Sequence, residues 1–139
     1  GGSGVEHEII RMRDEVKASG ILRDEEAEVI DAADVAGFFS SDIGRRMLAS
    51  PEIHREWGFN LFREEENLLI QGVIDCAFVE NGNWILLDYK TDRIEDPEVF
   101  CESYRPQLAW YAVALETLTG RKVHEKCLYA LSTGQVFPV

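Results

Sequence analysis

The sequence predicts a mixed α/β fold, in which helices flank a mixed central sheet. Apolar residues recur at helical spacing in the first third of the chain and again after residue 103. Between these regions, shorter apolar segments alternate loosely and are separated by turn signals, as strands are. Helices, a strand meander, a long helix and closing strands together predict a sheet with helices packed on it.

A single domain is expected over residues 5–139. A chain of 139 residues, 45% apolar and 29% charged, is long enough for one substantial core but not for two. Residues 1–4, Gly-Gly-Ser-Gly, have the composition of an added flexible linker and are set apart. This arrangement suggests a domain taken from a longer protein.

Three helices are expected before residue 50. The expected ranges are residues 5–19, 25–39 and 41–49. Gly20 is a suitable stop for the first helix, and Asp24 is a suitable N-cap for the second. The third begins behind Ser41 and ends before Pro51, because a residue that precedes proline disfavours helical backbone.

Three strands are expected next, joined by two tight turns. The expected ranges are residues 52–62, 67–79 and 84–90. Residues 64–67 form the first turn, and the Asn-Gly-Asn sequence at 81–83 is a strong hairpin signal. Because both connections are short, the three strands are expected to form an antiparallel meander.

The C-terminal part is expected to add a long helix and to close the sheet. The expected ranges are a polar connection at 93–102, a helix at 103–120 and one or two strands within 123–139. Ser103 is the expected N-cap, Pro106 falls in the first turn and Gly120 ends the helix. Thr133-Gly134 divides the closing strands.

Composition argues against several classes of protein. No apolar run approaches the roughly 20 residues that span a bilayer, and no segment resembles a signal peptide. The cysteines are odd in number, far apart and without zinc-site or disulfide spacing: Cys76, Cys101 and Cys127. A reducing, cytoplasmic setting is therefore expected.

The net charge of −12 argues against a protein that holds nucleic acid by its own surface field. Acidic residues gather at residues 24–26, 64–66 and 95–96, where solvated faces and loops explain them. If the domain acts on DNA, metal ions or a partner must offset the repulsion.

Three charged residues interrupt the two apolar strands of the second hairpin. Counting outward from Gly82, Asp75 falls opposite Asp88, and directly opposite residues bring their Cβ atoms to ~5 Å. The two-residue period of a strand then places Lys90 on the same face as Asp88, and points the side chain of Tyr89 into the fold. Two carboxylates and an ammonium are thus expected to meet at one end of a buried hairpin.

This constellation predicts a metal site with hydrolytic chemistry. Two neighbouring carboxylates repel each other, and a hard divalent cation such as Mg²⁺ removes the repulsion. A cation held by Asp75 and Asp88 can polarise a phosphodiester and activate water, and Lys90 can stabilise the developing charge. The backbone carbonyl of Tyr89 is a further candidate ligand. The alternative is an ion pair at the sheet edge, in which Lys90 bridges two aspartates.

The motifs carry a family resemblance. "GVID", "WILLDYKTD" and "YRPQLAWYAVAL" resemble the PD-(D/E)xK nuclease domains of the RecB class, and more closely those at the C-terminus of AddA-type helicase–nuclease proteins. The resemblance implies a restriction-endonuclease-like core. It also implies that Asp75, Asp88 and Lys90 bind Mg²⁺, with Mn²⁺ as a substitute, and cut DNA.

The following helix and a neighbouring strand supply supporting candidates. Gln107 and Tyr111 match a Q-x-x-x-Y motif of the family, and their i, i+4 spacing places both on one helical face. For Tyr111 the alternative is an ordinary core aromatic. Glu56 could reach the metal or Lys90 from the next strand, and a sheet-edge carboxylate is an equal alternative.

The resemblance further implies a place in a larger machine. In related enzymes a helicase motor feeds a DNA strand, here expected to be single, to the nuclease domain during double-strand break processing and recombination. An AddB-like second subunit is the implied partner. Related nucleases also carry a metal-binding His on a more N-terminal helix, which this chain is expected to lack. The alternative function is a catalytically incomplete module of the same fold that guides DNA or binds a partner subunit.

Overall fold

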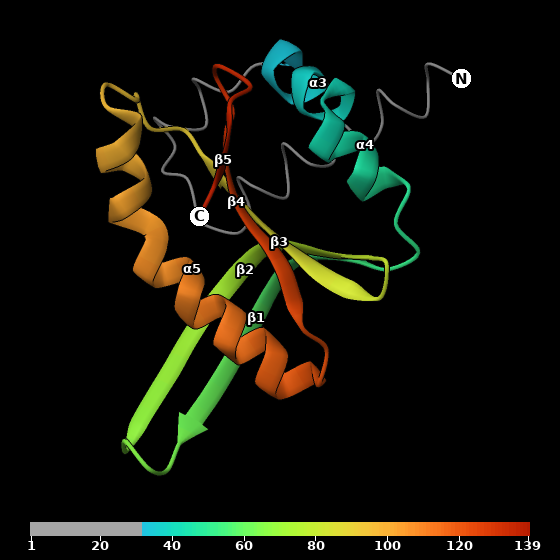
Figure 1. The fold of residues 1–139 in the computed structure, drawn as a ribbon. Coiled ribbons are helices and arrows are strands. Elements are labelled where there is room, and N and C mark those ends of the chain that lie inside the picture. The colour runs from blue at the N-terminus through green and yellow to red at the C-terminus, as the bar shows by residue number, and fades with distance from the viewer. Residues whose placement is uncertain (1–31) are drawn as a thin grey trace.

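A computed structural model describes residues 32–139. The expected linker, the helix at 5–19 and the first part of the helix at 25–39 lie outside the described residues. The described part is a mixed five-stranded sheet with α3 and α4 on one side and α5 on the other (Figure 1). The predicted fold class, a mixed α/β sheet flanked by helices, is confirmed.

The observed elements agree with most of the expected ranges. The helices are α3 (Ala32–Ser40), α4 (Asp42–Leu48) and α5 (Pro97–Thr119). The strands are β1 (Ile53–Arg63), β2 (Leu68–Glu80), β3 (Asn83–Lys90), β4 (Val123–Ala130) and β5 (Val136–Pro138). None of the helices in the described part of the chain combines the length and apolar character that crossing a membrane requires.

The sheet has the strand order β1-β2-β3-β4-β5 and one parallel pair. The pairs β1–β2, β2–β3 and β4–β5 are antiparallel, and β3 runs parallel to β4. A parallel pair needs a long crossover, and α5 provides it. Asn81 and Gly82 turn the β2–β3 hairpin with positive φ angles of 52° and 80°, as the Asn-Gly signal predicted.

The start of α5 was predicted wrongly. The helix begins at Pro97, and its N-cap is Asp96, whose carboxylate accepts hydrogen bonds from the backbone N–H groups of Glu98 and Val99. Ser103 lies inside the helix and donates to the Val99 carbonyl at 2.8 Å. Asp-Pro-Glu is itself a helix-start signal. The polar character of the preceding residues hid it, because this first turn is mostly exposed.

The predicted end of α5 is confirmed. Gly120 is the C-cap, with φ 74° in the left-handed region, and its N–H donates to the Glu116 carbonyl. Pro106 lies within the helix rather than in its first turn. The chain then enters β4 directly beside β3.

Two apolar cores lie on opposite faces of the sheet. The core of the α3–α4 face joins both helices to alternate residues of the central strands: Val35, Phe38, Phe39, Ile43, Met47, Cys76, Phe78, Ile85, Leu87, Tyr89, Cys127, Tyr129 and Leu131. The core of the α5 face contains the other set: Ile74, Ala77, Val79, Trp84, Leu86, Phe100, Leu108, Ala112, Leu115 and Leu128. Strand alternation therefore divides the sheet between two sealed layers.

Strands β1 and β2 exchange faces part of the way along. On β1, Ile53 packs with the α3–α4 core, whereas Trp57 packs with the α5 core, although strict alternation would place them on one face. On β2, Cys76 packs with the α3–α4 core and Ile74 packs with the α5 core, although strict alternation would again place both on one face. The exchange falls at Glu56, whose φ is 50°. Its register position is opposite Asp75, between two regular pairs.

Candidate active site

Asp75 and Asp88 lie together where the β2–β3 ladder ends. The paired register stops at Cys76 and Leu87, so the aspartates occupy the next opposed positions. Both are only 6% exposed, and they are the only buried charged residues within 32–139. The backbone N–H of Tyr89 donates to Asp75 Oδ2 at 2.9 Å. One carboxylate thus takes the place that a strand carbonyl would otherwise fill.

Burial gives the pair an electrostatic conflict. Burial raises the pKa of Asp75 well above its ordinary value, and the charge of Asp88 and a hydrogen bond with it raise the pKa further. The Tyr89 N–H and the charge of Lys90 oppose this shift without cancelling it. Without a cation the pair therefore retains a proton, and a divalent cation would replace that proton. Two buried carboxylates of this kind fit a hard ion such as Mg²⁺.

Lys90 lies on the same face as Asp88. Its Nζ is 2.8 Å from Asp88 Oδ2, and its side chain is 16% exposed. The same ammonium lies 3.8 Å from the centre of the Tyr104 ring. The ammonium is therefore held between a carboxylate and an aromatic face, at the edge of a largely buried site.

The Tyr89 side chain points to the opposite face, as strand alternation predicts. Its ring packs in the α3–α4 core, with its centre 5.2 Å from that of Phe38. The apolar anchor holds the backbone between Asp88 and Lys90 in place. A ligand role for the Tyr89 carbonyl stays a prediction.

Gln107 and Tyr111 meet on α5 beside the aspartates. Gln107 Nε2 donates to Tyr111 Oη at 3.1 Å. Partial burial raises the pKa of Tyr111, and the charges of Asp88 and Asp75 raise it further, so the phenol lies within the field of both carboxylates. The helical i, i+4 spacing thus places both side chains at the end of the sheet that carries the aspartates.

Gly72 has a packing role that the sequence did not reveal. A Cβ atom at this position would lie 2.7 Å from Tyr111 Cε1 and 3.1 Å from the Phe59 ring. Real side chains do not approach so closely, so the glycine allows the Tyr111 ring to cross β2. Only the position of α5 over the sheet shows why a glycine stands three residues before Asp75.

Glu56 lies on β1, across from Asp75 in the strand register. Among the described residues, no three His, Cys, Asp or Glu side chains come together as a group that could hold a metal. Glu56 therefore does not join Asp75 and Asp88 in a three-carboxylate cluster in this structure. Two carboxylates leave coordination positions for water and for phosphate oxygens, as Mg²⁺ sites in phosphoryl enzymes do.

Sequence reasoning missed Tyr104 and Asp92. Tyr104 covers Lys90, and its hydroxyl donates to Asp92 Oδ2 at 2.7 Å. Tyr104 precedes Gln107 by three residues, so the two share a helical face. Both residues lie within the helix expected from the sequence, but the contact with Lys90 depends on how α5 packs on the sheet.

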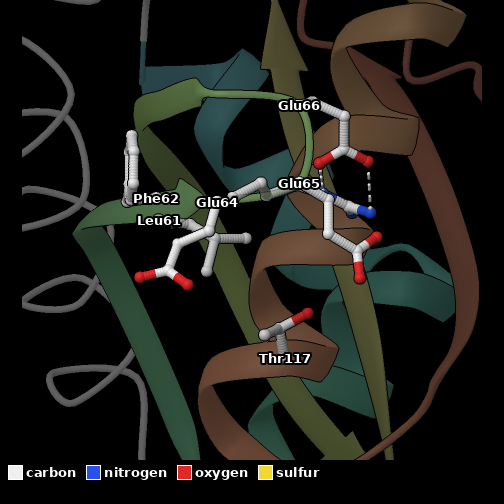
Figure 2. Close-up of a pocket in the computed structure, with 7 residues that line it drawn as sticks. Leu61, Phe62, Glu64, Glu65, Glu66 and Thr117 are labelled. Atoms are coloured by element: carbon white, nitrogen blue, oxygen red, sulfur yellow. Dashed lines mark hydrogen bonds and ion pairs between the residues drawn. The ribbon is translucent and has the colours of Figure 1, made fainter.

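A separate hollow of about 570 Å³ lies between the β1–β2 turn and α5 (Figure 2). Its lining residues are Leu61, Phe62, Arg63, Glu64, Glu65, Glu66 and Thr117. Arg63 donates two hydrogen bonds of 3.0 Å to Glu66, drawn as dashed lines in Figure 2. The three glutamates are exposed, and neither aspartate of the candidate site lines the hollow. The solvated acidic turn expected from the sequence is thus a feature apart from the site.

The fold and the site define a class of protein. Residues 7–136 match the family model of the PD-(D/E)XK nuclease superfamily, so the chain belongs to this superfamily. Asp88-Tyr89-Lys90 has the order of the (D/E)-X-K part of the superfamily's name.

Among curated proteins the chain is similar to the A-type subunit of the ATP-dependent helicase/nuclease of several bacteria. It is 40% identical to that of Acetivibrio thermocellus and 38% identical to that of Ruminiclostridium cellulolyticum, over 88% and 84% of this chain. Identity to the Alkaliphilus metalliredigens protein is 36% over 95% of this chain. The matches cover 11%, 11% and 12% of those relatives. The chain therefore spans only a small part of their length.

Proposed function

We propose that this chain is the metal-dependent DNA nuclease domain of an ATP-dependent helicase–nuclease. The observation that carries the proposal is the burial of Asp75 and Asp88 against each other, with Lys90 2.8 Å from Asp88. A structural ion pair gives no reason for a second buried carboxylate, whereas a divalent cation offsets the repulsion between the two. The helicase/nuclease relatives support the parent assignment.

The chain's own residues divide the work of phosphodiester hydrolysis. Asp75 and Asp88 would hold Mg²⁺ or Mn²⁺, with the Tyr89 carbonyl as a further ligand. The bound cation supplies polarisation of the phosphate and a lowered pKa of water. Lys90, on the same face, orients the attacking water or stabilises charge on the phosphate.

Gln107, Tyr111 and Glu56 take supporting roles in this proposal. The hydrogen bond from Gln107 to Tyr111 fixes the phenol beside the aspartates. From there both side chains can contact a DNA backbone that enters the site. Glu56 lies one strand away, and its position across from Asp75 suits a contact through water.

The acidic surface suits a domain that receives its substrate from a motor. With a net charge of −12, the domain alone would bind DNA weakly, because its surface field repels the phosphate backbone. We propose that the helicase portion of the parent protein and an AddB-like subunit deliver a single strand during double-strand break processing and recombination. The absence of a disulfide framework in the sequence favours a cytoplasmic location.

The test is cleavage of linear single-stranded DNA by this chain with Mg²⁺ or Mn²⁺. Asp88→Ala is expected to lower the cleavage rate by roughly 10³-fold or more, because it removes a ligand from a two-carboxylate site. Asp42→Ala is the matched control, since Asp42 is an exposed aspartate on α4 with a side chain 95% exposed. It should leave the rate unchanged.

Thermal unfolding with and without the metal separates the remaining outcomes. Ligation stabilises only a folded site, so Mg²⁺ or Mn²⁺ should raise the melting temperature of the wild type and not of Asp88→Ala. Stabilisation without cleavage would favour an incomplete DNA-guiding or subunit-binding module. If neither signal appears, the two aspartates and Lys90 are a structural ion cluster and the proposal is wrong.

A further inference from the structure

Tyr104 forms an aromatic support for the Lys90 ammonium. The ring centre lies 3.8 Å from Lys90 Nζ, well within the range over which a ring attracts a cation. The contact joins the last residue of β3 to α5, and the chain between them is a connection of six residues. It therefore depends on the way in which α5 packs on the sheet (Figure 1).

The Tyr104 ring is held at two points. Its hydroxyl donates to Asp92 Oδ2 at 2.7 Å, and its ring packs edge-on against Phe100 with centres 5.4 Å apart. Asp92 lies in the connection directly after β3, whereas Phe100 lies one turn earlier on α5. An aromatic side chain has few rotatable bonds, so these two contacts give its face a defined orientation toward Lys90.

Lys90 needs a support that does not compete for a metal. In the described structure Asp88 attracts the ammonium directly. A divalent cation bound by Asp88 would share that carboxylate and would repel the lysine. The face of a neutral ring attracts the ammonium in either state and is not a ligand for a hard cation.

We propose that Tyr104 is a positioning residue for Lys90, with Asp92 as the anchor of its ring. This inference rests on the proposed nuclease function and adds a residue to the same site. Tyr104 acts through Lys90: it keeps the ammonium on the α5 face of β3 when Asp88 turns its charge toward a metal. The alternative is that Tyr104 is only one more aromatic side chain of the α5 core.

The first test needs no cleavage. In an NMR spectrum of the metal-free chain, the ring current of Tyr104 should shift the Lys90 ε-methylene protons upfield. Tyr104→Phe keeps the ring but loses the hydrogen bond to Asp92, so a smaller upfield shift should remain, whereas Tyr104→Leu should abolish the shift. Phe137→Leu is the matched control, because it removes a ring of the same core that packs against Phe100, and not the ring over Lys90.

Addition of Mg²⁺ makes this test decisive. The upfield shift of Lys90 should persist at saturating Mg²⁺ in the wild type. A return of the resonance to the ordinary lysine position would show that the ring does not hold the ammonium beside a bound metal, and would overturn the inference.

Single-turnover cleavage gives the functional consequence. Tyr104→Leu should lower the rate constant roughly tenfold with little change in the DNA concentration needed for half-saturation, because a displaced Lys90 acts on the reacting phosphate. The rate constant of Tyr104→Phe should fall between those of the wild type and Tyr104→Leu, because its ring remains near Lys90 but loses the hydrogen bond to Asp92. Phe137→Leu should lower the unfolding temperature and leave the rate constant of the folded chain unchanged.

The two proposals fail in different ways. A wild type that cleaves, an Asp88→Ala variant that does not and a Tyr104→Leu variant at full rate would overturn the role of Tyr104 alone. Cleavage that survives Asp88→Ala would overturn the proposed function, while the Lys90 resonance would still report whether the ring holds the ammonium.

Discussion

The two faces of the sheet are covered by different helices and serve different purposes, although the same strands supply both. Along β3, Ile85, Leu87 and Tyr89 point into the α3–α4 core, and every one of them is buried and apolar or aromatic. On the α5 face, Trp84 and Leu86 are followed by Asp88 and Lys90. The α5 face is sealed near the hairpin turn and becomes polar at the other end.

This difference shows how a small domain can bury charge without losing its core. The residues that alternate with the candidate site anchor its backbone in the α3–α4 layer, so the strand stays ordered beneath an unfavourable pair of carboxylates. Stability is thus supplied by one face and chemistry by the other. Substitutions on one face therefore test whether the other responds.

The largest expected effect is on the α3–α4 face. Phe38 is completely buried, and its ring centre lies 5.0 Å from that of Tyr129 and 5.2 Å from that of Tyr89. Phe38→Ala should lower the free energy of unfolding by about 4 kcal/mol, because it leaves a cavity at the centre of this core. Urea denaturation would measure the loss.

The matched control is Phe62→Ala on β1, whose side chain is 54% exposed and which should change the free energy of unfolding by less than about 1 kcal/mol. Metal-dependent cleavage by the folded fraction of Phe38→Ala should be preserved. A specific loss of cleavage in the folded molecules would show that the two faces are not separable.

The second-largest effect is an increase in the free energy of unfolding, where Phe38→Ala gives a decrease. Because burial and Asp88 raise the pKa of Asp75 above its ordinary 3.8, the folded chain binds a proton more tightly than the unfolded chain does. The stability that this group contributes is present below pH 3.8 and is lost as the pH rises toward the folded pKa. Asp75→Asn lacks this titration and should be more stable than the metal-free wild type at pH 7, by the order of 2 kcal/mol.

Denaturation at several pH values would check this prediction. The gap between Asp75→Asn and the wild type should widen as the pH rises from about 4 toward 8, and Mg²⁺ should reverse the order by stabilising only the wild type. A gap that does not depend on pH would mean that Asp75 is not forced to hold a proton.

The third effect concerns the contact between Tyr111 and the sheet. Gly72→Ala should destabilise the chain by about 1.5 kcal/mol, because the new Cβ would lie 2.7 Å from Tyr111 Cε1. Displacement of the Tyr111 ring should also lower cleavage. In Gly58→Ala the added Cβ meets nothing closer than 4.0 Å, so this variant is the control and should retain activity. Equal effects of the two substitutions would rule out the packing role of Gly72.

The smallest effect tests where α5 begins. Asp96→Ala should cost about 1 kcal/mol, because the Asp96 carboxylate caps the first turn. Ser103→Ala, at the position expected from the sequence to be the cap, should cost clearly less. Urea denaturation of both variants would compare the two starts directly, and a larger loss in Ser103→Ala would favour the shorter helix.

Much of the β2–β3 hairpin could be predicted because its determinants are local. Turn chemistry at Asn81 and Gly82 sets the register, and the two-residue period of a strand then places Asp75 across from Asp88. The end of α5 at Gly120 is local in the same sense, because only a residue that tolerates a positive φ fits the cap.

The packing around the site could not be predicted in this way. The exchange of faces at Glu56 depends on how β1 and β2 pack against α3 and α4 on one side of the sheet and against α5 on the other. The reason for Gly72 depends on a ring from α5, about forty positions later in the sequence. Tyr104 was missed because its contacts with Lys90 and Asp92 depend on how α5 packs on the sheet.

By itself, the sequence determined the fold class, the strand meander and the pairing of two carboxylates with a lysine, because alternation and turn preference act between neighbours in the chain. The tertiary structure alone decided that both aspartates are buried, that Tyr104 covers Lys90 and that Tyr111 crosses Gly72. Burial and side-chain contact between distant segments arise only when α5 packs on the sheet. The raised pKa of Asp75 and the contact between Tyr104 and Lys90 therefore arise only in the folded protein.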